Sequence, residues 1–122
     1  MTGEVLSMWD VLDGDWLYLG RPLEGVLDVA TLVGQAGRVA PLFGDEASGE
    51  PFRAKGPAGL ELLPVAAADL RGKEEWLRAA LAQGATEIAF DPDPVSLAPT
   101  LAFPIDKGLW YVLSHRRETA CL

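Results

Sequence analysis

The tetrapeptide Asp91-Pro92-Asp93-Pro94 is the most distinctive group of chemically competent residues in the chain. Two carboxylates two residues apart, stiffened by prolines, can present oxygen atoms to a hard cation. An EF-hand calcium loop needs more oxygen ligands than this, and the pattern is more typical of a turn. In such a turn each proline fixes its own φ and pushes the preceding aspartate toward extended backbone. Because ligands of open α/β sheets bind beyond the carboxyl ends of strands, Asp91 and Asp93 remain candidates for a site.

A basic cluster, His115-Arg116-Arg117-Glu118, is the second candidate. Arginine pairs with carboxylate and phosphate groups, so the cluster could bind an anion. It is more typical of a solubilising segment that offsets part of the negative charge of a strongly acidic chain. The sequence assigns no role to His115 or Arg116.

Motifs for nucleophilic, metal and nucleotide chemistry are missing from the sequence. It contains no phosphate-binding loop, no G-x-G-x-x-G, no H-E-x-x-H, no G-x-S-x-G and no C-x-x-C. A mechanism that needs two histidines in one chain is excluded, since there is one. Asp45 and Glu46 are expected at a helix start, where they complement the helix dipole. We therefore assign no catalytic, cofactor-binding or metal-binding residue and no cofactor, and favour a non-enzymatic function.

The negative charge of the chain is concentrated in its first half. The 122 residues carry a net charge of −8, which argues against binding to nucleic acid or to an anionic membrane surface. Residues 1–50 contain nine acidic residues and only two basic ones, Arg21 and Arg38. This half either keeps the protein soluble or provides an acidic face for a basic partner.

Cysteine usage and overall composition indicate the compartment. The single Cys121 cannot form an intrachain disulfide. The first residues lack the pattern of a signal peptide, and no apolar stretch reaches the length of a membrane span. We therefore expect a cytoplasmic protein. The absence of Asn and the excess of Arg over Lys fit a thermophile or a GC-rich genome.

Four tryptophans are many for a chain of this length. Trp9 and Trp76 lie on apolar faces of expected helices and are assigned to the core. Trp16 and Trp110 lie in expected strands. A tryptophan exposed at the surface would indicate an interface with a second copy or a partner, because aromatic residues concentrate at binding hot spots.

Apolar periodicity and turn residues place the secondary structure. Helices are expected at 3–13 and 73–83, with a further turn or two after 45; strands are expected at 16–19, 38–43, 60–65, 86–90, 101–105 and 109–113. Segment 23–36 fits neither period cleanly and is interpreted as a strand or a short hairpin partner. Pro41 predicts that its strand lies at a sheet edge or is bulged. The Gly- and Pro-rich segment 48–59 predicts a loop.

These elements predict one α+β (or α/β) domain over residues 1–122. It combines a mixed sheet with two or three helices and a C-terminal β-hairpin. The hairpin follows from Asp106-Lys107-Gly108 between two apolar runs.

The middle of the chain resembles the SseB-like family, named for enhanced serine sensitivity. The resemblance covers about residues 38–94 and rests on four pieces: 39–46, 62–65, 75–84 and 88–92. Two features depart from the family pattern: Asp91 stands where Asn is usual, and 48–59 replaces a longer helix. The resemblance implies an α/β module without an agreed enzymatic activity, and it carries over no catalytic residue.

Two functional hypotheses follow. The favoured one is a module that binds another protein or a second copy of itself. The alternative is a small-molecule or metal-ion binding protein or enzyme with a site near Asp91 and Asp93. The alternative requires polar side chains that converge on a cleft, whereas those that the sequence places look peripheral.

Overall fold

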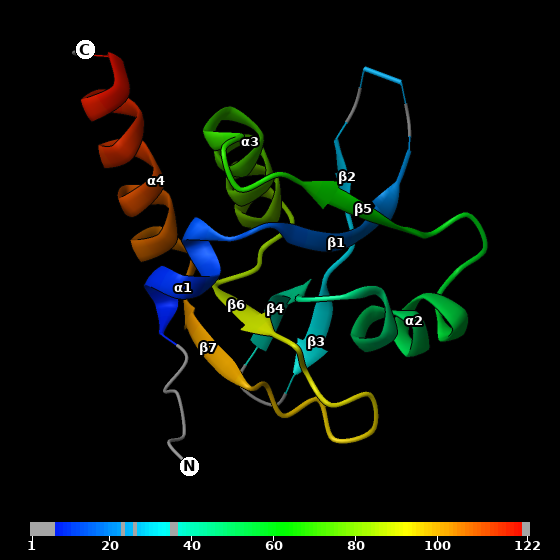
Figure 1. Ribbon diagram of the computed structural model, residues 1–122. Helices are drawn as coiled ribbons and strands as arrows, with labels where there is room; N and C mark the ends of the chain where they lie inside the picture. The colour runs from blue at the N-terminus through cyan, green and yellow to red at the C-terminus, as the bar shows by residue number, and fades with distance from the viewer. Residues whose placement is uncertain (1–6, 23, 26, 35–36, 121–122) are drawn as a thin grey trace.

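The computed structural model describes residues 7–22, 24–25, 27–34 and 37–120 (Figure 1). These residues form four helices and a seven-stranded sheet with parallel and antiparallel pairs. The predicted α+β class with a mixed sheet is therefore confirmed, with more helices than the two or three expected. Cys121 and the first residues of the helix expected at 3–13 lie outside the described residues. Among those described, no helix has the length and apolar composition to span a membrane.

The elements follow one another in a mixed order. The helices are α1 (Met8–Asp13), α2 (Glu46–Lys55), α3 (Leu70–Ala82) and α4 (Ile105–Ala120). The strands are β1 (Trp16–Arg21), β2 (Asp28–Val29), β3 (Leu32–Gly34), β4 (Gly37–Phe43), β5 (Glu61–Val65), β6 (Glu87–Phe90) and β7 (Leu101–Pro104). The strands expected at 16–19, 60–65, 86–90 and 101–105 are thus confirmed, and segment 23–36 supplies the two short strands β2 and β3.

The sheet is built around β1, β4 and β6. β4 and β6 are parallel, and the chain crosses from one to the other through α2, β5 and α3. β1 lies antiparallel to β4 on one edge and to β5 on the other, and β7 lies antiparallel to β6. β2 pairs with the end of β1, and β3 with the start of β4. The two carboxyl ends of the parallel pair therefore lie side by side.

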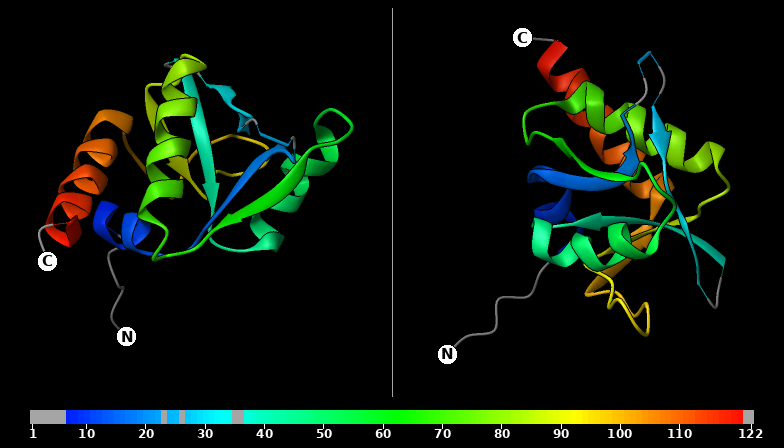
Figure 2. Two further views of the ribbon diagram at one scale, coloured as in Figure 1. Left: turned by 90° about the horizontal axis from the view of Figure 1, so that it is seen from above. Right: turned by 90° about the vertical axis from the view of Figure 1, so that its right-hand side faces the viewer.

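Helices cover both faces of the sheet (Figure 2). Alternate residues of β1 face opposite sides: Trp16 and Tyr18 belong to the main core, and Leu19 to a smaller cluster with Phe43 and Phe52. The main core includes residues of α1, α3 and α4, whereas Phe52 comes from α2. Period-two alternation thus fixes which helix each side chain of β1 meets.

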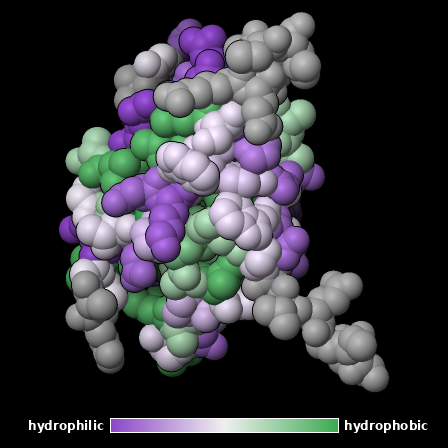
Figure 3. Space-filling view, turned by 90° about the vertical axis from the view of Figure 1, so that its left-hand side faces the viewer, coloured by the Kyte–Doolittle hydropathy of each residue, from purple (hydrophilic) through white to green (hydrophobic). Residues whose placement is uncertain are grey.

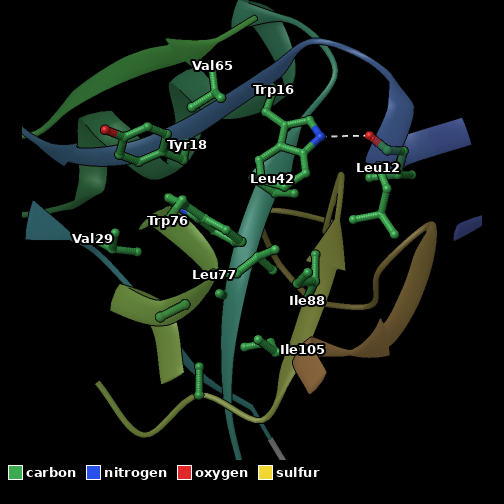
Figure 4. Close-up of a cluster of buried hydrophobic side chains, with 14 of the residues drawn as sticks. Leu12, Trp16, Tyr18, Val29, Leu42, Val65, Trp76, Leu77, Ile88 and Ile105 are labelled. Carbon is green, nitrogen blue, oxygen red and sulfur yellow. Dashed lines mark hydrogen bonds between the residues drawn. The ribbon is translucent and has the colours of Figure 1, made fainter. Parts of the chain in front are cut away.

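Two buried tryptophans form the centre of the main core (Figure 4). Trp16 and Trp76 are fully buried, and their rings meet edge to face with centroids 5.4 Å apart. The Trp16 indole Nε1–H donates to the backbone carbonyl of Val11 at 2.7 Å. Trp76 comes from α3, which Asp69 caps through the Gly72 N–H at 2.9 Å. The helix expected at 73–83 is confirmed, with its start three residues earlier.

The prediction that strand 38–43 lies at a sheet edge is wrong, because β4 has neighbours on both edges. The alternative of a bulge at Pro41 stays a prediction. Pro41 is nevertheless accommodated. The β3 register includes β4 residues up to Val39, and the β1 register begins at Leu42. Neither register includes Pro41, so its missing N–H removes no bond from those two ladders.

The loop expected at 48–59 is also wrong over residues 48–55, where α2 continues to Lys55. Asp45 caps this helix by accepting the Ser48 N–H at 2.8 Å, as the acidic start predicted. Gly49 is buried so closely that an added Cβ would lie 2.5 Å from a methyl group of Leu62. Tertiary packing at Gly49 and Phe52 therefore holds a helix that the internal Pro51 disfavours.

The predicted C-terminal β-hairpin is wrong as well: residues 101–104 form β7, but α4 replaces the second strand. Ile105, Gly108 and Val112 are buried, and their spacing is that of one helix face. Gly108 packs closely rather than turning the chain, since a Cβ there would lie 3.5 Å from Leu12, Leu77 and Phe103.

Candidate functional site

The carboxyl ends of β4 and β6 open on a hollow of about 550 Å³. The first turns of α2 line one side, and residues of the loop 91–100 line the other. Asp91 is one of the lining residues, and its Oδ1 accepts the Gly44 N–H at 2.9 Å. Its φ is +44°, so the expectation of an extended Asp91 is wrong. Aspartate tolerates this left-handed region better than most residues, and the Gly44 contact holds it there.

The two carboxylates of the tetrapeptide serve different partners. Burial raises the pKa of Asp91, against the Gly44 hydrogen bond, and the nearby Asp45 charge raises it further. Asp93 accepts the N–H groups of Ser96 and Val95, which lower its pKa. Within the described ranges, no three His, Cys, Asp or Glu side chains gather as a metal site requires. Both aspartates line the hollow, Asp91 half-buried and Asp93 exposed.

The basic cluster lies within α4, because the strand expected at 109–113 is part of that helix. The Arg116 guanidinium binds the Glu74 carboxylate, to which Arg78 also donates at 2.8 Å. The His115 ring packs on Tyr111, with centroids 4.1 Å apart, and its Nδ1 lies 3.0 Å from the Tyr111 carbonyl oxygen. Arg116 thus joins α4 to α3. Because its guanidinium group is paired with the Glu74 carboxylate, the structure gives no support to anion binding by Arg116.

Three aromatic residues of α1 and α4 lie at the surface, and together we call them the aromatic face: Trp9 and Trp110, which are exposed, and Tyr111, which is half-buried. Trp110 is 66% exposed and Trp9 is 46% exposed. The Trp9 and Tyr111 rings pack with centroids 4.7 Å apart, so the two helices share this surface. Figure 3 shows this side of the molecule, where apolar side chains lie among strongly hydrophilic ones. The assignments of Trp9 to the core and of Trp110 to a strand are both wrong.

Helix geometry explains why these rings point outward. α1 has six residues, and its buried positions are Val11 and Leu12, so Trp9 falls on the outer side. On α4, burial of Ile105, Gly108 and Val112 turns Trp110 away from the core. A capping box between Ser7 and Asp10 begins α1 and fixes its first turn.

A second hollow, which we call the Tyr111 cleft, adjoins the aromatic face. It has a volume of about 460 Å³, and its polar lining residues are Asp13, Lys73, Tyr111 and His115. These side chains come from the end of α1, from α3 and from α4. The Tyr111 hydroxyl donates to the Asp13 carboxylate at 2.8 Å. Polar side chains therefore do converge on a cleft, although not at the place considered from the sequence.

Lys73 is fully buried beneath this cleft. Its ammonium group donates to the carbonyls of Leu12 at 2.6 Å and Ala67 at 3.0 Å, and lies 5.1 Å from the centroid of the Trp16 ring. Burial lowers the pKa of Lys73, against the neighbouring carboxylates. Because Leu12 lies in the last turn of α1, the ammonium also complements the negative end of that helix.

Sequence reasoning missed Asp13, Lys73 and Tyr111. One signal was present for Lys73, which falls with Trp76, Leu77 and Ala80 at the spacing of one helix face. A lysine in such an apolar stripe indicates either a buried charge or a functional amine. The contact between Asp13 and Tyr111 could not be predicted from local sequence patterns, because the two residues are 98 positions apart. In addition, Tyr111 was expected in a strand.

The chain matches no family model, and no curated protein matches its sequence. The resemblance to the SseB-like family therefore stays a prediction.

Proposed function

We propose that this protein is a small, non-enzymatic module that binds a protein partner through the aromatic face. The observation that carries the proposal is the exposure of two tryptophans, Trp9 and Trp110, on adjacent helices. Tryptophan and tyrosine contribute most to binding when a partner excludes water from them. No other described residue of this size is apolar and so exposed, because the remaining exposed large apolar side chains are Val33, Leu81 and Val95.

The charges around the aromatic face favour a basic partner over a second copy of the chain. Asp10, Asp13 and Asp106 are exposed on α1 and at the start of α4, against one exposed cation there, Lys107. Asp106 lies four residues before Trp110 and so shares its side of the helix. A second copy would bring carboxylates against carboxylates, which is unfavourable.

The remaining features of the proposal rest on the sequence. A net charge of −8 supports a partner other than nucleic acid. The lone cysteine supports a cytoplasmic location, where thiols stay reduced.

Affinity capture from the native cell extract, read by quantitative mass spectrometry, tests the proposal. We compare the wild type with the double variant Trp9→Ser/Trp110→Ser and with Val33→Ser, which removes an exposed apolar side chain from β3. The same partner should be retained by the wild type and by Val33→Ser and lost by the double variant. Equal retention by all three would refute the proposal, as would the absence of any enriched protein together with a monomer in light scattering.

A second candidate function is small-molecule binding in the hollow beside Asp91. The observation that favours it is the position of a half-buried carboxyl group at the carboxyl ends of two parallel strands. The hollow is lined by several prolines and alanines, so a ligand would pack apolar surface there and hydrogen-bond to Asp91.

Thermal-shift screening of metabolites and metal ions tests this candidate, with Asp91→Ala and Asp93→Ala as matched variants. A ligand of the hollow should raise the melting temperature of the wild type but not that of Asp91→Ala. The candidate fails if no compound stabilises the wild type, or if both variants respond as the wild type does.

A further inference from the structure

A further pocket, which we call the Arg38 pocket, has a volume of about 340 Å³. It is lined by residues from 19–21, 28–32 and 52–60, and by Arg38 and Gln83. The register of β1 with β4 covers Leu17 and Tyr18; beyond this contact β1 pairs with β2, and β4 pairs with β3. Among the lining residues that the structure describes, none comes from α1 or α4, so the pocket is separate from the aromatic face.

Part of the lining is apolar. Leu19 and Phe52 belong to the smaller core cluster, and Leu32 packs against that cluster. All three residues line the pocket, as does the half-buried Leu60. An apolar group in the pocket would therefore contact the side chains of this cluster and leave water.

The pocket also contains the basic side chains of the acidic half of the chain. Residues 1–50 include two basic residues, Arg21 and Arg38, and both line the pocket. Asp28 supplies the one carboxylate among the described lining residues, and it lies 3.7 Å from the Nε of Arg21. Because Asp28 pairs with Arg21, the charge of Arg38 has no carboxylate to neutralise it within the pocket.

Arg38 differs from the other arginines whose side chains the structure describes. Each of the others forms an ion pair with an aspartate or a glutamate: Arg21, Arg53, Arg71, Arg78 and Arg116. Among the described residues Arg38 has no such partner, and its Nη1 donates instead to the Thr31 hydroxyl at 2.8 Å. In a chain with 18 acidic residues against ten lysines and arginines, an arginine held away from every described carboxylate is suited to an external anion.

Two neutral donors lie in the same lining. The Thr31 oxygen accepts from Arg38, so its own O–H can donate elsewhere. The exposed Gln83 side chain brings an amide N–H₂ group to the lining. A carboxylate accepts several hydrogen bonds at once, and a guanidinium group binds it through two N–H groups. The donor set therefore matches a carboxylate.

Two helix ends in the lining oppose an anion. Gly56 and Gln83 cap the carboxyl ends of α2 and α3, where backbone carbonyls carry a partial negative charge. In the last turn of α2, Arg53 and Lys55 offset this charge. A helix end carries about half an elementary charge, which is less than the full charge of the Arg38 guanidinium. The balance favours a ligand with a single negative charge over a phosphate dianion.

We propose that the Arg38 pocket binds a small-molecule monocarboxylate with an apolar body. The carboxylate binds the Arg38 guanidinium and the Thr31 hydroxyl, and the apolar body packs against Leu19 and Phe52. The volume of the pocket lies at the small end of the range for ligand pockets, which suits a ligand of this kind. The site goes beyond the proposed function and requires no protein partner.

An NMR titration of the ¹⁵N-labelled chain with phenylacetate tests the inference. Phenylacetamide, which lacks the charge, and acetate, which lacks the apolar body, serve as comparison probes. Phenylacetate should shift the amide signals of residues 31, 56 and 83 in a saturable way. It should bind at least about tenfold more tightly than either comparison probe, because each of them loses one of the two contacts.

Matched variants locate the contact. Arg38→Gln and Arg71→Gln each remove one positive charge, but Arg71 does not line the pocket. Arg38→Gln should weaken phenylacetate binding by about tenfold or more, whereas Arg71→Gln should leave it unchanged. Thr31→Val removes the hydroxyl at nearly constant volume and should weaken binding by about threefold or more.

Three results would overturn the inference. The first is the absence of a saturable shift at residues 31, 56 and 83 with phenylacetate. The second is equal affinity for phenylacetate and phenylacetamide, which would show that the pocket does not recognise the carboxylate. The third is wild-type affinity in both Arg38→Gln and Thr31→Val, or an equal loss in Arg38→Gln and Arg71→Gln.

Discussion

Lys73 holds α1 against α3 through hydrogen bonds to two backbone carbonyls, those of Leu12 and Ala67. The hydrogen bond to Leu12 is buried and the one to Ala67 is partly buried. A buried carbonyl that loses its donor carries the cost of desolvation without compensation. We therefore expect Lys73→Met to lower the free energy of unfolding by about 2–4 kcal/mol in urea. The control variant Arg71→Met removes an exposed side chain that pairs with Glu75, and it should change the free energy of unfolding little. A Lys73→Met variant as stable as the wild type would contradict this role.

We expect Asp91 and Asp93 to affect the pH dependence of stability in opposite directions, because their pKa values are shifted in opposite directions. The pKa of Asp91 is raised, mainly by burial, so the folded state binds its proton more tightly than the unfolded state does. Stability contributed by Asp91 therefore falls as pH rises from about 3.9, the ordinary value, through the raised pKa. Asp91→Asn should thus be more stable than the wild type at neutral pH, and this gain should shrink in acid.

Asp93 serves as the matched control with the opposite sign. Its pKa is lowered by the backbone N–H groups of Ser96 and Val95. Its contribution is therefore present at neutral pH and is lost as pH falls through the lowered pKa. Asp93→Asn should be less stable than the wild type at neutral pH, with the difference shrinking in acid. Unfolding curves at two pH values check both, and equal signs for the two variants would refute the assignment.

Individual residues show which features of the site could be predicted from the sequence and which could not. Asp45 was placed correctly, because helix capping depends on a residue three positions away. Asp91 was correctly put at a strand end but given the wrong backbone conformation, because its contact with Gly44 crosses 47 residues. No local pattern contains that contact.

At the scale of elements, α4 is the largest departure from expectation. Asp106-Lys107-Gly108 has the composition of a turn, yet the tertiary environment selects the helical period of Ile105, Gly108 and Val112. Short apolar runs fit a strand and a helix alike, and only their partners decide between the two. The helix α3 was predictable because its apolar residues follow the helical period. The strand β1 was predictable because its aromatic and apolar run ends at Gly20-Arg21-Pro22.

A substitution at Gly108 separates the helix from the hairpin. Alanine is favoured over glycine inside a helix by about 1 kcal/mol, and an added Cβ would make ordinary contacts at 3.5 Å. Gly108→Ala should therefore leave stability unchanged or raise it by up to about 1 kcal/mol in urea unfolding. In a hairpin turn that requires positive φ, the same change would destabilise the protein.

Gly84 provides the control for this comparison. It follows α3 with a φ of +90°, a backbone conformation that side chains disfavour. Gly84→Ala should therefore cost about 1 kcal/mol or more. If Gly108→Ala destabilised the protein as much as Gly84→Ala does, the helical assignment of Gly108 would be wrong.

At the scale of the whole molecule, the acidic first half of the chain provides both sheet and surface. Residues 1–50 contribute α1 and the strands β1 to β4, so the acidity is not confined to a separate segment. Asp10 and Asp13 lie beside aromatic residues that come from both ends of the sequence, Trp9 from α1 and Tyr111 from α4. Only the assembled fold brings this acidic and aromatic surface together.

The hollow beside Asp91 and the aromatic face lie on different parts of the molecule. α2 borders the hollow beside Asp91 and packs on the face of the sheet opposite the main core (Figure 2). α1 and α4 carry the aromatic face on the other side. A ligand in the hollow and a partner on the aromatic face would therefore not compete for space, and variants at the two sites can be read independently.

Photo-cross-linking in the native cell tests the central claim most directly. A photoreactive phenylalanine analogue replaces Trp110, and in a second strain it replaces Val33, which is 67% exposed on β3. If the aromatic face binds a partner, position 110 gives an adduct of one discrete mass that weakens when Trp9 is also changed to Ser, and position 33 does not. No adduct at position 110, or the same adducts from both positions, would contradict the account.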